Sequence, residues 1–219
     1  MSTTNSAAKT RSPLSERLDL IISPVFAAAL AILGFAVWTY SDLDKITIAI
    51  LSPDKVQRQI GETLILGLTS SILVVLIAVP VGILVTRKGY PRLKNLLVST
   101  LGLGQALPAY GLIVIFFSFM GSGIVTVILA LATFSLLPVL RNTIVGLEQV
   151  DKSVIDAARG MGLTARQILL KIELPLSVEV ILGGIRTAVV INVGFSALAF
   201  LVGGGGLGET INSGLKLDR

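Results

Sequence analysis

The 219-residue sequence contains no cysteine and no histidine. Without cysteine the chain can form no disulfide bond and has no thiol nucleophile. Without histidine it lacks the commonest general base and transition-metal ligand. Charged residues make up only 14% of the chain, where a soluble domain carries about a quarter. Aromatic residues make up 5%, with a single tryptophan. We therefore expect no catalytic residue, no metal site and no enzyme activity in this chain.

Hydrophobic residues account for 53% of the chain, and the mean hydropathy is +0.87. This balance indicates that much of the surface faces lipid. The net charge of +5 would favour a nucleic-acid partner in a soluble protein. Here the basic residues lie in short segments beside long apolar ones, which is the pattern that orients membrane proteins. The expected partner is the lipid bilayer, and not nucleic acid.

Five apolar segments have the length of membrane-spanning helices, which need about 20 residues. They follow a polar tail, residues 1–19. The first is interpreted as a retained helix, because it is too long for the core of a cleavable signal peptide. The third and fourth are divided by the turn sequence Met-Gly-Ser-Gly at residues 120–123. The segments are residues 20–41, 63–86, 96–119, 124–140 and 176–202, and they predict an all-α, polytopic transmembrane helical bundle.

The distribution of basic residues predicts the orientation of this bundle. The tail and the two loops on its side carry twelve Lys and Arg residues, and the loops on the other side carry three. Cytoplasmic loops are enriched in Lys and Arg. We therefore expect a multi-pass protein with its N-terminus and the long loop 141–175 in the cytoplasm.

The loop 141–175 is polar and ends in the sequence DAARGMGLTARQILLKIELP. Asp151 or Ser153 can cap a first short helix, and Asp156 in its first turn would complement the helix dipole. Gly162 is a natural residue to end that helix. Thr164 can cap a second helix, which Pro175 would stop, and Pro175 would then begin the next helix. The pattern predicts two short helices at the membrane surface, a shape that a partner's groove can hold.

The spacing of seven residues in this loop resembles the "EAA" loop of bacterial ATP-binding-cassette (ABC) importer permeases, with Asp where the family usually has Glu. The residues are Asp156, Ala157, Ala158, Gly162, Ile172, Leu174 and Pro175. An ordinary amphipathic loop at the membrane interface is the alternative. The resemblance covers residues 61–219 as a permease core and implies a type I ABC importer fold, with a cytoplasmic coupling helix gripped by a separate ATPase.

Three further stretches resemble the permeases of quaternary-ammonium osmoprotectant importers, for glycine betaine, choline or carnitine. They are residues 78–108, 135–151 and 183–211. Importers of methionine or another amino acid are the alternative. The resemblance implies an ATPase subunit, a second permease subunit and an extracytoplasmic substrate-binding protein as partners, in a bacterial inner membrane. It implies that this chain binds no cofactor and that ATP is bound by the partner ATPase.

Four polar or helix-breaking residues inside the apolar segments are candidates for the translocation path. Gln105 and Pro108 lie in the third segment, where Pro108 is expected to break or kink the helix. Asn192 and Ser196 lie one turn apart in the fifth. Hydrogen bonding between packed helices is the alternative role for these side chains. Arg186, also in the fifth segment, either reaches the cytoplasmic interface or pairs within the bundle.

After the fifth segment the chain enters the glycine-rich sequence GGGGLG and ends within a short amphipathic segment. The resemblance implies a further helix beyond this point. The sequence therefore predicts a permease without its last helix, and a non-functional truncated permease is a further alternative.

Overall fold

The computed structural model describes residues 22, 25, 26, 28–30, 32–36, 48, 50–87 and 91–217. The chain divides into two compact units, Met1–Ala49 and Ile50–Arg219. In the first unit the described residues are helical, and their side chains are mostly exposed. The expected tail at residues 1–19 and about half of the expected helix at 20–41 lie outside the described residues.

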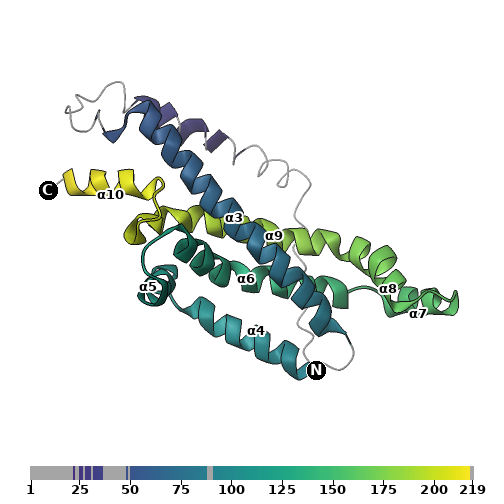
Figure 1. Ribbon diagram of the computed structural model, residues 1–219. Coiled ribbons are helices and arrows are strands. Elements are labelled where there is room, and N and C mark those ends of the chain that lie inside the picture. Colours follow the sequence, from purple (N-terminus) through teal and green to yellow (C-terminus); the bar gives the residue numbers. More distant parts are fainter. Residues whose placement is uncertain are drawn as a thin grey trace, which may run out of the picture. The chain divides into compact units, whose positions relative to one another are not determined.

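The second unit consists of helices, and no described residue lies in a strand, so the all-α prediction is confirmed (Figure 1). The elements are α3 (Pro53–Thr86), α4 (Pro91–Ala106), α5 (Ala109–Met120), α6 (Ile124–Glu148), α7 (Lys152–Gly160), α8 (Ala165–Ile168), the π-helical segment Leu169–Glu173, α9 (Leu174–Phe195), the 3₁₀ segment Ser196–Val202 and α10 (Gly208–Leu217).

Helices α3, α6 and α9 pack against one another along their lengths and form the centre of this unit. Glycines allow their backbones to approach closely. A Cβ atom built on Gly67 of α3 would lie 2.9 Å from the Val193 Cα of α9, and one built on Gly184 of α9 would lie 2.9 Å from the Pro138 carbonyl oxygen of α6. Small residues at such contacts are typical of helices packed in membranes.

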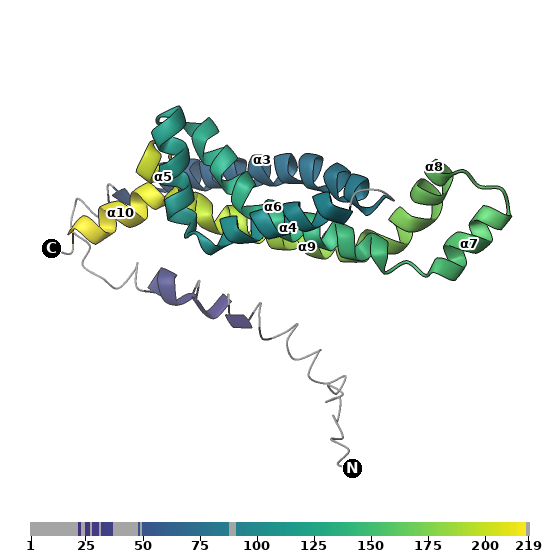
Figure 2. The same cartoon turned by 90° about the horizontal axis from the view of Figure 1, so that it is seen from below.

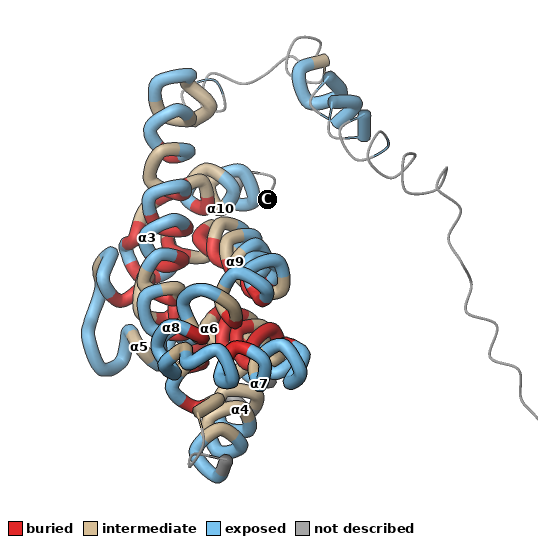
Figure 3. Tube along the Cα trace, turned by 90° about the vertical axis from the view of Figure 1, so that its right-hand side faces the viewer, coloured by how far each residue is buried: buried red, intermediate tan, exposed pale blue. Residues whose placement is uncertain are grey.

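Three helical stretches among the described residues are long and apolar enough to cross a membrane: Pro53–Thr86, Ile124–Glu148 and Ala165–Val202. Many of their large apolar side chains are exposed, and Figure 3 shows exposed positions along these helices. Such a surface suits lipid, and continuous helices satisfy their own backbone hydrogen bonds in a medium without water. The multi-pass membrane character of the chain is therefore supported by helix length and by surface composition.

The single helix expected at residues 96–119 is two helices, α4 and α5, separated at Leu107 and Pro108. Proline has no N–H to donate, and it disfavours a helical conformation in the residue before it. Pro108 instead stands at the N-cap position of α5, where its carbonyl oxygen accepts from the Leu112 N–H at 3.2 Å. Consequently neither half is a span by itself, and the described residues of the second unit contain three candidate spans, whereas four of the five expected spans lie there.

Two other helices extend beyond their expected limits. Helix α3 begins at Pro53, ten residues before the expected start at residue 63, and α6 continues to Glu148 rather than ending at residue 140. The extension of α6 buries Thr143, Ile144 and Leu147, so packing rather than hydropathy determines where the helix ends. The expected loop 141–175 therefore begins after Glu148.

Candidate functional site

The segment predicted to couple the chain to an ATPase begins with α7. The Asp151 carboxylate accepts from the Ser153 backbone N–H at 2.8 Å and caps this helix. This hydrogen bond lowers the pKa of the exposed Asp151 carboxyl below its ordinary value of 3.8, and a hydrogen bond from the Ser153 hydroxyl adds a smaller shift in the same direction. The predicted cap is confirmed, and the carboxylate is charged at neutral pH.

Helix α7 ends in a glycine turn. The Gly162 N–H donates to the Arg159 carbonyl oxygen at 2.9 Å, and the Leu163 N–H donates to the Ala158 carbonyl oxygen at 3.1 Å. These two bonds form a Schellman motif, whose C′ residue takes a left-handed conformation that favours glycine. Gly162 has this conformation, with φ of +82°. The turn reverses the chain and leaves the Ala158 side chain fully buried.

Helix α8 begins with a capping box. The Thr164 hydroxyl accepts from the Gln167 backbone N–H at 3.4 Å, and the Gln167 side-chain carbonyl oxygen accepts from the Thr164 N–H at 2.8 Å. Two otherwise unpaired N–H groups are thereby satisfied. Thr164 was expected as the cap, and the reciprocal contact with Gln167 strengthens it.

The expectation that Pro175 stops this second helix is wrong, whereas the expectation that Pro175 begins the next helix is confirmed. Helix α8 runs through the π-helical segment Leu169–Glu173 directly into α9, with Pro175 in the first turn of α9. The Leu174 N–H donates to the Leu169 carbonyl oxygen, five residues back. A π-turn is wider than an α-turn, and it is consistent with a proline that cannot donate to the carbonyl four residues before it. The predicted coupling segment is therefore continuous with a candidate membrane span.

Asp156 lies in the middle of α7, not in its first turn as expected. Its exposed carboxylate accepts from the Arg159 guanidinium at 3.0 Å, one helical turn away. Ala157 is exposed beside it, and Val154 and Met161 expose 41% and 72% of their surface. Figure 2 shows α7 and α8 projecting beyond the ends of α3 and α6. The projection presents a small apolar and charged tip that a partner can reach.

The seven predicted coupling residues divide into two groups. Asp156, Ala157, Ala158 and Gly162 belong to the projecting tip, and Ile172, Leu174 and Pro175 belong to the helical connection at its base. Of these base residues, Ile172 and Leu174 are half-buried and Pro175 is exposed.

One ion pair at this base was not predicted. The Arg87 guanidinium, at the end of α3, donates to the Glu173 carboxylate at 2.8 Å. The Glu173 side chain is only 10% exposed. The sequence did indicate that Glu173 needs a partner, because this charged residue stands among Ile168, Leu169 and Ile172 on the apolar face of the second helix. A second pair at the same end, between Lys94 of α4 and Glu148 of α6, is more exposed.

The path candidates Gln105 and Pro108 lie at the break between α4 and α5. The Gln105 amide nitrogen donates to the Phe134 carbonyl oxygen of α6 at 3.2 Å and is partly buried. Pro108 is exposed between the two helices. The break therefore leaves a short stretch of non-helical backbone, residues 107–108, between the two helices.

The other two path candidates, Asn192 and Ser196, are fully buried among the helices of this chain. In the amide orientation that satisfies both polar atoms of Asn192, its nitrogen donates to the Ser135 hydroxyl at 2.9 Å and its oxygen accepts from the Ser71 hydroxyl at 3.0 Å. The Ser196 hydroxyl donates to the Val193 carbonyl oxygen of its own helix. Asn192 thus joins α9 to α3 and α6. Arg186 is exposed on α9 and forms no ion pair within the described part of the chain.

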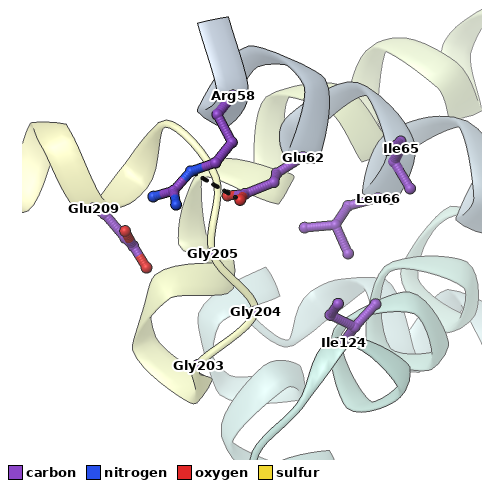
Figure 4. Close-up of a pocket in the computed structure, with 9 residues that line it drawn as sticks. All are labelled: Arg58, Glu62, Ile65, Leu66, Ile124, Gly203, Gly204, Gly205 and Glu209. Carbon is purple, nitrogen blue, oxygen red and sulfur yellow. Dashed lines mark ion pairs between the residues drawn. The ribbon is translucent and has the colours of Figure 1, made fainter. Parts of the chain in front are cut away.

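The opposite end of the bundle contains the glycine-rich turn between the 3₁₀ segment and α10. The Glu62 carboxylate of α3 accepts from the Gly206 N–H at 2.8 Å, and the Thr63 hydroxyl accepts from the Leu207 N–H at 3.0 Å. A cavity of about 320 Å³ lies between this turn and α3 (Figure 4). Its charged residues are Glu209 and the ion pair of Arg58 with Glu62, which measures 3.5 Å.

No cluster of metal-ligating side chains occurs among the residues that the structure describes. Two features of the second unit remain as candidate sites: the projecting helical tip at one end of the bundle and the glycine turn at the other.

Known proteins resemble this chain over most of its length. The carnitine transport permease protein OpuCB of Listeria monocytogenes is 38% identical over 161 residues, which cover 74% of this chain and 73% of that protein. The choline transport system permease protein OpuBB of Bacillus subtilis (strain 168) is 38% identical over 158 residues, 71% of each chain. A solved structure of the inward-facing MetNI methionine ABC transporter matches with a TM-score of 0.64 and 25% identity, covering 76% of this chain and 81% of the other.

The family described as "Binding-protein-dependent transport system inner membrane component" matches residues 78–217, which include the glycine turn, the projecting tip and two of the three candidate spans. The chain belongs to this family of inner-membrane transport components.

Proposed function

We propose that this chain is the permease subunit of an ABC importer that moves a quaternary-ammonium osmoprotectant, such as glycine betaine, choline or carnitine. The observation that carries the proposal is the 35–40% identity to relatives named as carnitine, choline and glycine betaine transport permeases, over about 64–74% of this chain. The similarity extends well beyond the projecting tip, so it concerns the membrane helices as well as the contact with a motor.

The projecting tip supports the proposed coupling to an ATPase. Its first helix is capped at Asp151, its turn is held by Gly162, and its base continues without interruption into α9. A rigid tip joined to a spanning helix can pass a movement of the ATPase into the bundle. ATP is bound and hydrolysed on the partner, and this chain needs no cofactor of its own.

Two further partners complete the proposed importer. A second permease subunit, identical or homologous, would complete the path, and an extracytoplasmic binding protein would deliver the solute to the glycine-turn end of the bundle. The excess of Lys and Arg in the tail and in loops 87–95 and 141–175 supports a cytoplasmic N-terminus and tip. The importer then resides in a bacterial inner membrane.

The proposed path passes the break between α4 and α5. Irregular backbone at membrane depth is tolerated where it is buried in protein or lines a water-filled cavity, and Gln105 and Pro108 provide such a place. Asn192 and Ser196 have no exposed surface in this chain. We therefore assign the second pair to the packing that shapes the path rather than to its wall.

Uptake by intact cells tests the cargo. The chain, with its partner subunits, is expressed in a bacterium that lacks its own osmoprotectant importers. We expect growth at high salt to be restored by glycine betaine, choline or carnitine, with uptake of the labelled compound. Labelled methionine serves as the competing cargo. Uptake of methionine, without uptake of any of the three osmoprotectants, would contradict the proposal.

A further inference from the structure

The projecting tip is joined to the bundle at three places. Two are covalent, because residues 149–151 connect α6 to α7, and α8, the π-helical segment and α9 form one continuous helical stretch, Ala165–Val202. The third is the ion pair between Arg87 and Glu173, 86 residues apart in the sequence. It is the one ion pair among the described residues that links α3 to the Asp151–Pro175 region.

The geometry of this pair makes it more than a surface contact. Glu173 is 7% exposed as a residue, and its carboxylate accepts from Arg87 Nη2 at 2.8 Å. Arg87 is itself held in place, because its Nε donates to the Ile83 carbonyl oxygen of α3 at 3.3 Å. The Arg87 side chain is 35% exposed and the Glu173 side chain 10% exposed, so the pair is partly buried. Fully exposed ion pairs contribute little, whereas removal of Arg87 would leave a nearly buried carboxylate without its partner.

The position of Glu173 is also significant. It is the last residue of the π-helical segment, where the tip meets the spanning helix α9. Single π-turns inside helices often occur at functional sites. Without a contact to α3, this segment could bend and absorb a movement of the tip. A link from Glu173 to the end of α3 opposes such bending.

We propose that the Arg87–Glu173 pair transmits movement of the tip to α3, so that α3 and α9 move together when the ATPase moves. The inference rests on the proposed coupling to an ATPase. Arg87 and Glu173 are positioning residues, since they act through the helices that they join. The Lys94–Glu148 pair is the matched comparison, because it lies at the same end of the bundle and does not reach the tip.

Spin labels test the proposal independently of the cargo. Because the chain has no cysteine, one pair of cysteines can be introduced together, at Leu84 of α3 and at Leu170 of the π-helical segment, both about half exposed. In the complex with its ATPase, we expect the distance between the two labels to be the same with and without trapped ATP. In Glu173→Gln the distance should differ between the two states. A distance that changes in the wild type, or stays constant in the variant, would overturn the proposal.

Transport measurements provide the second readout. Glu173→Gln should retain ATP hydrolysis and lose about tenfold or more of its uptake, and the exchange of Arg87→Glu with Glu173→Arg should restore uptake. Glu148→Gln should leave the ratio of uptake to hydrolysis unchanged. An unchanged ratio in Glu173→Gln contradicts the inference. A wild-type complex that hydrolyses ATP but takes up no osmoprotectant contradicts the proposed cargo instead, and the label distances still decide the inference.

Discussion

The side-chain amide of Asn192 and the hydroxyl of Ser71 lie 3.0 Å apart and join α9 to α3 inside the bundle. Neither residue has more than 3% of its surface exposed. The same amide reaches the Ser135 hydroxyl of α6, so one side chain connects the three helices that form the centre of the unit. Hydrogen bonds between membrane helices contribute about 0.6 kcal/mol on average and up to about 1.7 kcal/mol.

Replacing this central amide should therefore destabilise the bundle. Asn192→Ala removes the contacts with α3 and α6 and leaves a cavity, and we expect a loss of about 1–3 kcal/mol in the free energy of unfolding. Unfolding of the purified protein in detergent measures the effect. Thr187→Ala is the control on the same helix, because Thr187 is exposed and its hydroxyl donates only to the Gly183 carbonyl oxygen. Equal losses in the two variants would contradict a special role for Asn192.

Two adjacent glycines of α9 should respond differently to the same substitution. A Cβ on Gly184 would lie 2.7 Å from the Asn142 side-chain nitrogen and 2.9 Å from the Pro138 carbonyl oxygen of α6, whereas a Cβ on Gly183 meets nothing within 4 Å. Gly184→Ala should lower stability by about 1–3 kcal/mol, because the backbone of α6 must move away. Gly183→Ala should be neutral or stabilising, because alanine favours a helix. Thermal unfolding of both variants measures the difference in stability, and equal melting temperatures would refute the packing described for Gly184.

The glycine turn offers a second matched pair. A Cβ on Gly208 would clash with the Ala197 carbonyl oxygen, whereas one on Gly214 meets nothing within 4 Å, and both glycines lie in α10. We expect Gly208→Ala to detach α10 from the 3₁₀ segment and to increase hydrogen exchange throughout residues 208–217. Gly214→Ala should leave exchange at that end of the bundle as slow as in the wild type. Fast exchange in both variants, or in neither, would show that α10 does not depend on this close contact.

The cap of α7 should be insensitive to pH in the physiological range. The bond from the Ser153 backbone N–H lowers the pKa of Asp151. The cap therefore contributes fully above the ordinary pKa of 3.8 and is lost only as the pH falls through the lowered value. Hydrogen exchange of the α7 amides, corrected for intrinsic rates, should be constant between about pH 8 and pH 5. It should be severalfold faster in Asp151→Ala and nearly unchanged in Asp151→Asn, which can still cap the helix. Protection that declines between these pH values would contradict this account of the cap.

Local signals in the sequence predicted the tip well. Gly162 marks a C′ position and Thr164 an N-cap by residue type alone, and the structure has both. Helix ends in the membrane were harder to predict. The start of α3 carries Asp54, Arg58 and Glu62, and a hydropathy pattern ends at the lipid boundary whether or not the helix does. The sequence therefore located the apolar part of α3 but not the full length of the helix.

Contacts distant in the sequence account for the remaining differences. The π-turn before Pro175 depends on a bond to the fifth preceding residue, which the periodicity of apolar residues does not report. The Arg87–Glu173 pair joins residues that only the packing of α3 against α9 brings together. Asn192 was identified as a polar residue within the membrane, but its partners on two other helices required the fold.

Substitution of the glycine at the turn of the tip should weaken binding to the ATPase. Gly160 and Gly162 both have open space around an added Cβ, but only Gly162 has a positive φ. A side chain at Gly162 therefore strains the backbone, by about 1–2 kcal/mol, and distorts the turn. Gly162→Leu should insert into the membrane and bind poorly to the ATPase, and Gly160→Ala should behave as the wild type does.

The central claim is that ATP hydrolysis on a partner drives an osmoprotectant through this chain by way of the tip. Its most direct test is the uptake of labelled glycine betaine into proteoliposomes that contain the complete importer, with ATP supplied to the ATPase. We predict concentrative, ATP-dependent uptake by the wild type and by Gly160→Ala, and loss of that uptake in Gly162→Leu at equal amounts of membrane-inserted protein. No ATP-dependent uptake by the wild type, or normal uptake by Gly162→Leu, would contradict the account.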